Sequence, residues 1–149
     1  MRFAAMLSGL VLLCGLANAQ QKGKDKKEPD KNLEPFQGTW KVVRAEFEGK
    51  EPKDKAPGEV RFTFKGDRLI VREGLKGDDD GKFAVNTKRK PTEIDLISSK
   101  GERIPGIYKF EDDGKLTLSF AKGKVAVRPK TFDTKKTMAG LLVLEKLKE

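Results

Sequence analysis

Apolar and polar residues alternate along the chain with a period of two over most of its length after residue 33. In Val60–Phe64 the apolar residues alternate with Arg61 and Thr63, and the same pattern recurs in Ile104–Phe110 and Leu116–Phe120. This alternation is typical of antiparallel strands that place one face on a core and the other in water. The pattern therefore predicts an all-β domain.

Turn residues separate these runs and set the expected topology. Turn signals occur at Gly49-Lys50, Gly66-Asp67, Lys100-Gly101 and Asp113-Gly114. The expected strands are 38–48, 60–65, 68–73, 81–86, 93–98, 103–110, 115–121 and 141–148, with a ninth short piece possible at 124–128. Short connections favour a single up-and-down antiparallel β-barrel of about eight strands, in which the last strand pairs with the first. The segment 129–140 has no strand pattern and is expected to form a short helix or a loop across one barrel end.

The first expected strand changes phase in its middle. Trp40 and Val42 lie on one face, whereas Val43, Ala45 and Phe47 lie on the other. A β-bulge or sharp bend near Val42-Val43 would bring both sets to the core. Gly106 stands inside another strand, where it would let a barrel turn a corner.

The N-terminus has the features of a secretory signal peptide over residues 1–19. Arg2 precedes an apolar run of about fourteen residues, and Ala17-Asn18-Ala19 forms a cleavage site. The run is shorter than the ~20 residues that span a bilayer, so no transmembrane segment is expected after cleavage. Lipidation at Cys14 is the alternative, but Leu13 stands where a small residue is needed. We expect an exported protein, periplasmic or extracellular.

Residues 20–32 are predicted to be a disordered, lysine-rich linker, and residues 33–149 the β-barrel domain. The chain carries a formal net charge of +9, to which Arg2 and the linker contribute three. The domain is therefore basic, and its charges are interleaved with acids along the chain. Solubility is the first interpretation, and an anionic surface or polymer as a partner is the second.

The composition excludes several kinds of chemistry. The chain has no histidine, and its one cysteine lies in the signal peptide. Ser-His-Asp and Cys-His arrangements are therefore excluded, as are the usual zinc and copper ligand sets. We expect no enzyme activity, no metal and no cofactor. Asp78-Asp79-Asp80 is interpreted as a polar hairpin loop, because consecutive carboxylates point apart and do not match an EF-hand.

Two polar groups remain as weaker candidates. Asp95, with Glu93 and Glu102, could carry carboxylate chemistry if Asp95 faced the barrel interior, but alternation places it with Glu93 on a solvated face. A basic set could bind anions, and its members are Lys88-Arg89-Lys90, Arg68 and Arg72. A solvated loop is the simpler interpretation. Nucleic acid is not expected, because the phenylalanines alternate inward and leave no stacking surface.

The barrel interior is the last candidate site. The residues expected to point inward are Phe62, Phe64, Phe83, Tyr108, Phe110, Phe120 and Trp40. Bulky rings in a short barrel favour a filled core, and a ligand-sized cavity is the alternative. The leading functional hypothesis is a non-enzymatic module that binds a small apolar or amphipathic ligand at the open barrel end, lined by Phe62, Phe64, Phe83, Tyr108 and Phe120. The alternative is an interaction module that binds an anionic envelope polymer, lipid surface or partner protein.

An ordered set of short motifs adds a family resemblance. The motifs are Phe36–Val43 with its Gly38-Thr39-Trp40, Glu46–Lys50, Phe62–Asp67, Ile94-Asp95-Leu96, Gly106-Ile107-Tyr108, Leu116-Thr117-Leu118 and Arg128-Pro129-x-x-Phe132. Together they resemble a family of small secreted lipocalin-like domains of planctomycete bacteria that has no assigned activity. The resemblance implies a fold and a compartment, but no substrate.

The likeness to lipocalins also implies roles for three residues. Gly38 and Trp40 would close one barrel end, and Arg128 would stack over Trp40 by a cation–π contact. Any binding site would then lie at the opposite end. The alternative role for Trp40, stacking on a sugar or another ligand, stays open.

Overall fold

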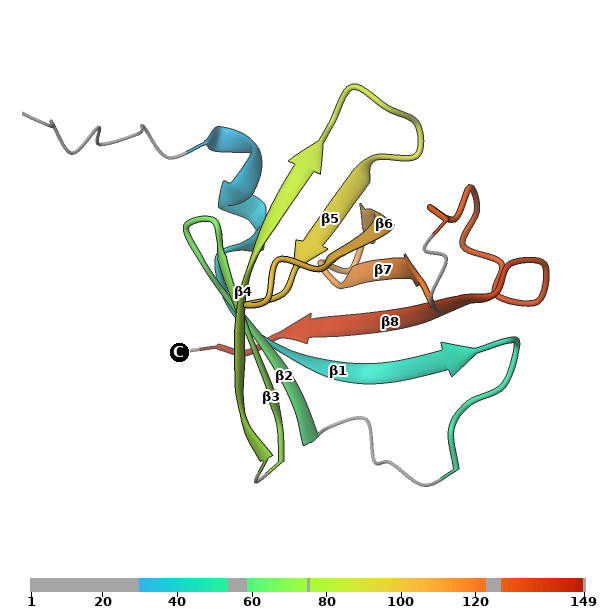
Figure 1. Ribbon diagram of the computed structural model, residues 1–149, viewed down its shortest axis with the longest axis horizontal. Coiled ribbons are helices and arrows are strands. Elements are labelled where there is room, and N and C mark those ends of the chain that lie inside the picture. Colours follow the sequence, from blue (N-terminus) through green and yellow to red (C-terminus); the bar gives the residue numbers. More distant parts are fainter. Residues whose placement is uncertain (1–29, 54–58, 75, 123–126, 149) are drawn as a thin grey trace, which may run out of the picture.

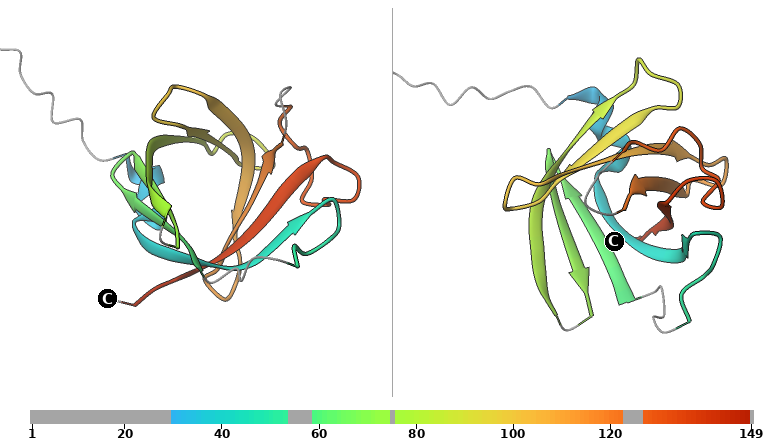
Figure 2. Two further views of the ribbon diagram at one scale, coloured as in Figure 1. Left: turned by 60° about the horizontal axis from the view of Figure 1, so that its bottom comes forward. Right: turned by 45° about the vertical axis from the view of Figure 1, so that its right-hand side comes forward.

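The chain forms a closed barrel of eight antiparallel strands in which each strand pairs with its neighbours in the sequence and the last pairs with the first (Figure 1). The computed structural model describes residues 30–53, 59–74, 76–122 and 127–148. The strands are β1 (Gly38–Phe47), β2 (Val60–Lys65), β3 (Arg68–Glu73), β4 (Lys76–Asn86), β5 (Glu93–Ile97), β6 (Arg103–Phe110), β7 (Leu116–Ala121) and β8 (Ala139–Lys146). Figure 2 shows them as a ring in its left view. The predicted all-β up-and-down barrel is confirmed.

The 3₁₀ helix η2 (Lys31–Phe36) precedes β1. No helix in the described part of the chain is long and apolar enough to cross a membrane. The predicted disordered linker 20–32 extends too far at its C-terminal end. Lys31 and Asn32 belong to η2, and the side chain of Asp30 accepts a hydrogen bond from Asn32 N. The predicted signal peptide 1–19 and linker residues 20–29 lie outside the described residues.

The bulge expected in the first strand is present. The register between β1 and β8 shifts between Val42 and Arg44, so that Val43 is the extra residue. Trp40 and Val42 are buried in the core, and Ala45 packs against it from beyond the bulge. One extra residue therefore lets both halves of β1 face the barrel interior.

Strand β4 begins five residues earlier than expected and includes Asp78, Asp79 and Asp80. The prediction of a polar hairpin loop here is wrong. Aspartate is unfavourable in strands. Here Arg72 of β3 lies directly opposite Asp78 and pairs with it, and Arg68 of β3 pairs diagonally with Asp80. These cross-strand ion pairs extend the β3–β4 hairpin through the acidic run.

Helix η2 folds across one end of the barrel and closes it. Gly38 has φ +114°, a left-handed conformation that favours glycine, and it turns the chain from η2 into β1. The ring of Phe36 is fully buried and lies 4.9–5.5 Å from four barrel rings, those of Phe64, Phe83, Tyr108 and Phe110. Trp40 Nε1 donates a 2.7 Å hydrogen bond to the carbonyl of Phe36. We call the barrel end that η2 covers the closed end, and the opposite one the open end.

The connection after β7 covers the outer wall of the last strands. Ile107, Ser119 and Leu141 pair across β6, β7 and β8 and are buried, although they face away from the barrel core. Phe132 lies beneath Lys109 of β6, with Nζ 5.0 Å from the ring centre. Thr134 accepts a hydrogen bond from Gly49 N and donates one to Glu46. The expected helix is wrong, because residues 127–138 contain none. The expected end-crossing loop is also wrong, because Arg128 and Phe132 of this segment lie against the outer faces of β5 and β6.

Replacing Phe36 should show how much the closed end stabilises the barrel. Phe36→Ala empties a fully buried site and should lower the free energy of unfolding by about 3–5 kcal/mol. Phe110→Ala is the control. Because Phe110 is 38% exposed, this variant should lower the free energy of unfolding by less than half as much. Urea denaturation measures both. Equal losses in the two variants would contradict the role given to Phe36.

Two neighbouring buried hydroxyls on β7 should respond in opposite directions. Ser119 Oγ is buried and has no hydrogen-bond partner in the described structure, whereas Thr117 Oγ1 donates to Glu111 at 2.8 Å. Ser119→Ala removes an unsatisfied polar group and should leave stability unchanged or raise it by about 1 kcal/mol. Thr117→Val removes the hydrogen bond to Glu111 and should lower the free energy of unfolding by about 1 kcal/mol. Thermal unfolding compares them, and a clear loss in Ser119→Ala would show that its hydroxyl is satisfied.

Candidate functional site

Of the five aromatic residues expected to line a ligand site, Phe62, Phe64, Phe83 and Tyr108 are buried in one packed core, and Phe120 packs against that core. Phe64, Phe83 and Tyr108 are 1–6% exposed, and each contacts the ring of Phe36. Burial also raises the pKa of Tyr108. These three side chains belong to the packed core of the closed end. Phe62 is buried against Phe64, and Phe120 is half-buried nearer the open end.

Around the open end, a set of inward-facing apolar side chains is only half-buried. Each comes from a different strand, and the set is Ala45, Val60, Val71, Leu96, Ile104 and Phe120. Apart from Phe120, these residues were not predicted to form a site, because the prediction from the sequence considered only large aromatic side chains. The sequence feature that could have identified them is their position at the strand ends distant from Gly38. This feature predicts a site only once the Gly38 end of the barrel is known to be closed.

The rim of the open end carries polar groups of both signs. Asp79 of β4 lies directly opposite Val71 of β3, so both side chains project from the inner face of the sheet. Asp79 is exposed. Lys122 Nζ lies 5.1 Å from the ring of Phe47, which packs over Gly140 beside Phe120. Outside this end, a groove of about 390 Å³ is lined in part by the exposed Val127 and Met138. The open end is thus an apolar mouth with a charged rim.

Arg128 does not stack on Trp40, so that expectation is wrong. Its guanidinium donates to the carbonyls of Gly106 at 2.6 Å and Ile94 at 3.3 Å, and it pairs with Asp95 at 2.6 Å. The cation over the Trp40 ring is Lys146, with Nζ 5.8 Å from the ring centre. Arg128 closes the outer wall and not the barrel end, since it ties the β7–β8 connection to β5 and β6.

The carboxylates considered for catalysis are in structural contacts or in turns. Asp95 faces outward, as alternation predicted, and also pairs with Arg103 at 3.1 Å. Glu93 lies 3.6 Å from Arg128 Nε. Glu102 is exposed in the turn between β5 and β6. Asp78 and Asp80 point to the outer face and Asp79 to the inner one, and the described residues contain no group of three or more metal-binding side chains.

The predicted basic set is also divided. Lys88, Arg89 and Lys90 are exposed beyond Asn86, in the turn between β4 and β5. Arg68 and Arg72 lie on the outer face of β3, where each pairs with an aspartate. The hydrogen bond from Arg72 lowers the pKa of Asp78. These five residues therefore do not form one patch.

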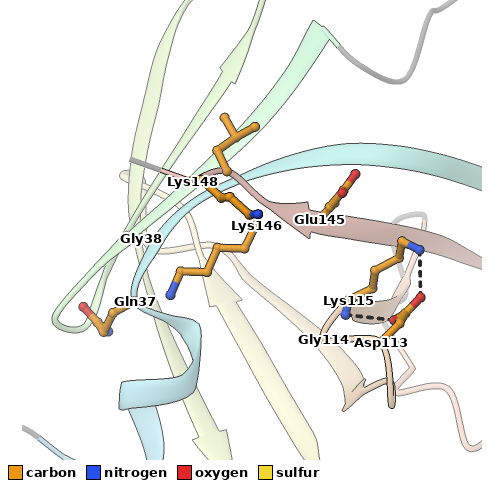
Figure 3. A pocket seen from close by; sticks show the side chains of 9 residues that line it. Gln37, Gly38, Asp113, Gly114, Lys115, Glu145, Lys146 and Lys148 are labelled. Carbon is orange, nitrogen blue, oxygen red and sulfur yellow. Dashed lines mark hydrogen bonds and ion pairs between the residues drawn. The ribbon is translucent and has the colours of Figure 1, made fainter.

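A polar groove of about 790 Å³ lies beside the closed end (Figure 3). Its lining includes Lys115, Lys146 and Lys148 together with Asp113 and Glu145. Lys115 Nζ pairs with Asp113 at 2.7 Å, and the hydrogen bonds from Lys115 lower the pKa of that carboxyl. Charges of both signs line the groove, which gives it no strong preference for an ion.

Comparison of the chain with protein-family models, with curated proteins and with solved structures finds no match. The resemblance to planctomycete lipocalin-like domains therefore stays a prediction.

Replacing Arg128 should separate its structural role from the expected stacking on Trp40. Arg128→Gln leaves Asp95 and two carbonyls without a strong donor and should cost about 2 kcal/mol. The control Arg103→Gln removes an exposed partner of the same Asp95 and should cost less than about 1 kcal/mol. Denaturation monitored by Trp40 fluorescence gives both values. A native emission maximum that shifts in Arg128→Gln but not in Lys146→Gln would restore the stacking assignment.

Proposed function

We propose that this protein is a non-catalytic binding module that takes a small apolar or amphipathic ligand at the open end of its barrel. The observation that supports this proposal is the difference between the two ends. At the closed end, Phe36 and the rings around it are sealed from water, except for part of Phe110. At the open end, Val60, Val71, Leu96, Ile104 and Phe120 face inward and are only half-buried. The proposed ligand would cover that remaining apolar surface.

The size of this surface limits the affinity. Covering roughly 200 Å² of apolar area would contribute about 5 kcal/mol at ~25 cal/mol per Å². Loss of translational and rotational freedom offsets much of this gain. The filled core beneath the mouth favours a shallow site, so we expect modest affinity and a ligand that is only partly enclosed.

The rim suggests how an amphipathic ligand would be oriented. Its apolar part would contact Leu96, Ile104 and Phe120, and its polar part would lie at the rim, near Asp79 or Lys122. Burial of a polar group without a hydrogen-bond partner is costly, which favours this orientation. The proposal includes export, which rests on the signal peptide expected over residues 1–19.

Binding of the apolar fluorescent probe N-phenyl-1-naphthylamine tests the proposal. The purified protein should increase the probe's emission, and Ile104→Asn should weaken binding at least tenfold by placing an amide in the apolar mouth. The control is Phe110→Ser, which changes an apolar side chain at the closed end and should bind like the unchanged protein. Circular dichroism confirms that both variants fold.

Two outcomes would contradict the proposal. One is no probe binding by the unchanged protein. The other is equal weakening by Ile104→Asn and Phe110→Ser, because the probe would then not distinguish the two barrel ends.

A further inference from the structure

The outer wall of β1–β4 carries two parallel rows of cations, which we call the cationic wall. In the first row, Arg61 of β2 lies directly opposite Lys41 of β1 and Arg72 of β3. In the second row, Arg68 of β3 lies directly opposite Lys65 of β2 and Lys82 of β4. Residues paired across strands project from the same face about 5 Å apart. Each row is therefore a short line of three positive charges.

A less charged row separates the two lines of cations. Between them, Thr39, Thr63 and Ile70 are paired across β1, β2 and β3, and Asp80 of β4 continues this row opposite Ile70. The hydroxyls of Thr39 and Thr63 lie 3.2 Å apart and are hydrogen-bonded to each other. Arg61 and Lys65 are four residues apart on β2, so the rows are separated by about 13 Å at ~3.3 Å per residue. The wall thus offers charge, then hydroxyl, then charge along the strands.

Acidic side chains neutralise only half of these cations. Lys41 pairs with Glu145, Arg72 with Asp78 and Arg68 with Asp80. Within the part of the chain that the structure describes, Arg61, Lys65 and Lys82 have no carboxylate partner, and all three are exposed. Arg61 is in the least favourable position, because it has a like charge on both sides. A bound anion would relieve this repulsion.

We propose that the cationic wall binds an extended acidic polysaccharide, a chain whose carboxylate or sulfate groups reach both rows. A small free anion can contact one row but cannot span about 13 Å. Arginine guanidinium groups match the planar carboxylate and the sulfate with paired hydrogen bonds. The threonine hydroxyls between the rows provide hydrogen-bond partners for sugar hydroxyls. This site lies on the outside of the barrel and is independent of a ligand at the open end.

Other anionic partners fit this wall less well. A lipid surface would favour large apolar side chains that insert beside the cations, but the exposed large apolar residues of the described chain are Phe110, Val127 and Met138, which lie on other strands and loops. Single-stranded nucleic acid favours aromatic rings for stacking, and the wall rows contain none. Charge and hydroxyl groups without rings favour a polysaccharide.

The test compares two variants that lose the same charge at different places. Arg61→Gln/Lys65→Gln removes one unpaired cation from each row. The matched control, Lys88→Gln/Arg89→Gln, removes two exposed cations from the turn between β4 and β5. Binding is measured to immobilised polygalacturonate for carboxylates and to dextran sulfate for sulfates, with monomeric galacturonate and anionic phospholipid vesicles as comparisons.

We expect the unchanged protein to bind at least one of the two polymers and to be released as salt rises from about 50 to 200 mM. The wall variant should bind at least tenfold more weakly, and the turn variant less than twofold. The bound polymer should raise the unfolding temperature of the unchanged protein but not of the wall variant. Ile104→Asn should bind the polymer normally, which separates this site from the proposed ligand site.

Four results would overturn the proposal. They are no binding to either polymer, equal weakening in the two charge variants, monomeric galacturonate competing as well as the polymer does per sugar unit, and tighter binding to the anionic vesicles than to the polymers. The second result would show that only net charge matters, and the last would make a lipid surface the better partner.

Discussion

The hydrogen bond from the Trp40 indole to the carbonyl of Phe36 holds helix η2 in place. Because η2 covers only one end of the barrel, the difference between the two ends depends on this bond. It fixes the end of η2 above the barrel, so that the Phe36 ring fills the space between Phe64, Phe83 and Tyr108. A buried indole N–H needs an acceptor, and the end of a short helix supplies a free carbonyl. Because this bond joins residues only four apart, the barrel end is closed by a local interaction. At the opposite end, the aromatic side chains of Phe47 and Phe120 meet over Gly140 but are only half-buried.

The outside of the barrel is divided in a similar way. On the β6–β8 side, Ile107, Ser119 and Leu141 are covered by the β7–β8 connection, which Arg128 fastens to β5 and β6. On the β1–β4 side, the cations lie in register, and Arg61, Lys65 and Lys82 among them are exposed. The molecule therefore has one covered wall, one cationic wall, one closed end and one apolar mouth. The proposed ligand would bind at the apolar mouth, and the proposed polysaccharide would bind on the cationic wall.

Much of the fold was predictable because alternation is a local property. The expected strands match the observed ones closely, and the change of phase at Val42-Val43 correctly predicted a bulge. The failures occurred where a partner distant in the sequence decides the structure. Asp78–Asp80 form a strand because Arg72 and Arg68 of the neighbouring strand pair with Asp78 and Asp80. Arg128 binds β5 and β6 because the connection folds back over the wall. Phe36 was not predicted to close the barrel end, because a single aromatic residue before Gly38 is not part of an alternating pattern.

The sequence by itself determined the strands, the order in which they pair and the face that each presents to the core, because a period of two and tight turns require no information from distant residues. It also excluded histidine-based chemistry, because the chain contains no histidine. Only the tertiary structure decided which barrel end is closed, which aromatic rings are core rather than lining, and which cations stand in line across neighbouring strands. These depend on register and on packing between distant segments. Gly38-Thr39-Trp40 indicated where closure occurs, and the position of Phe36 showed how it is achieved.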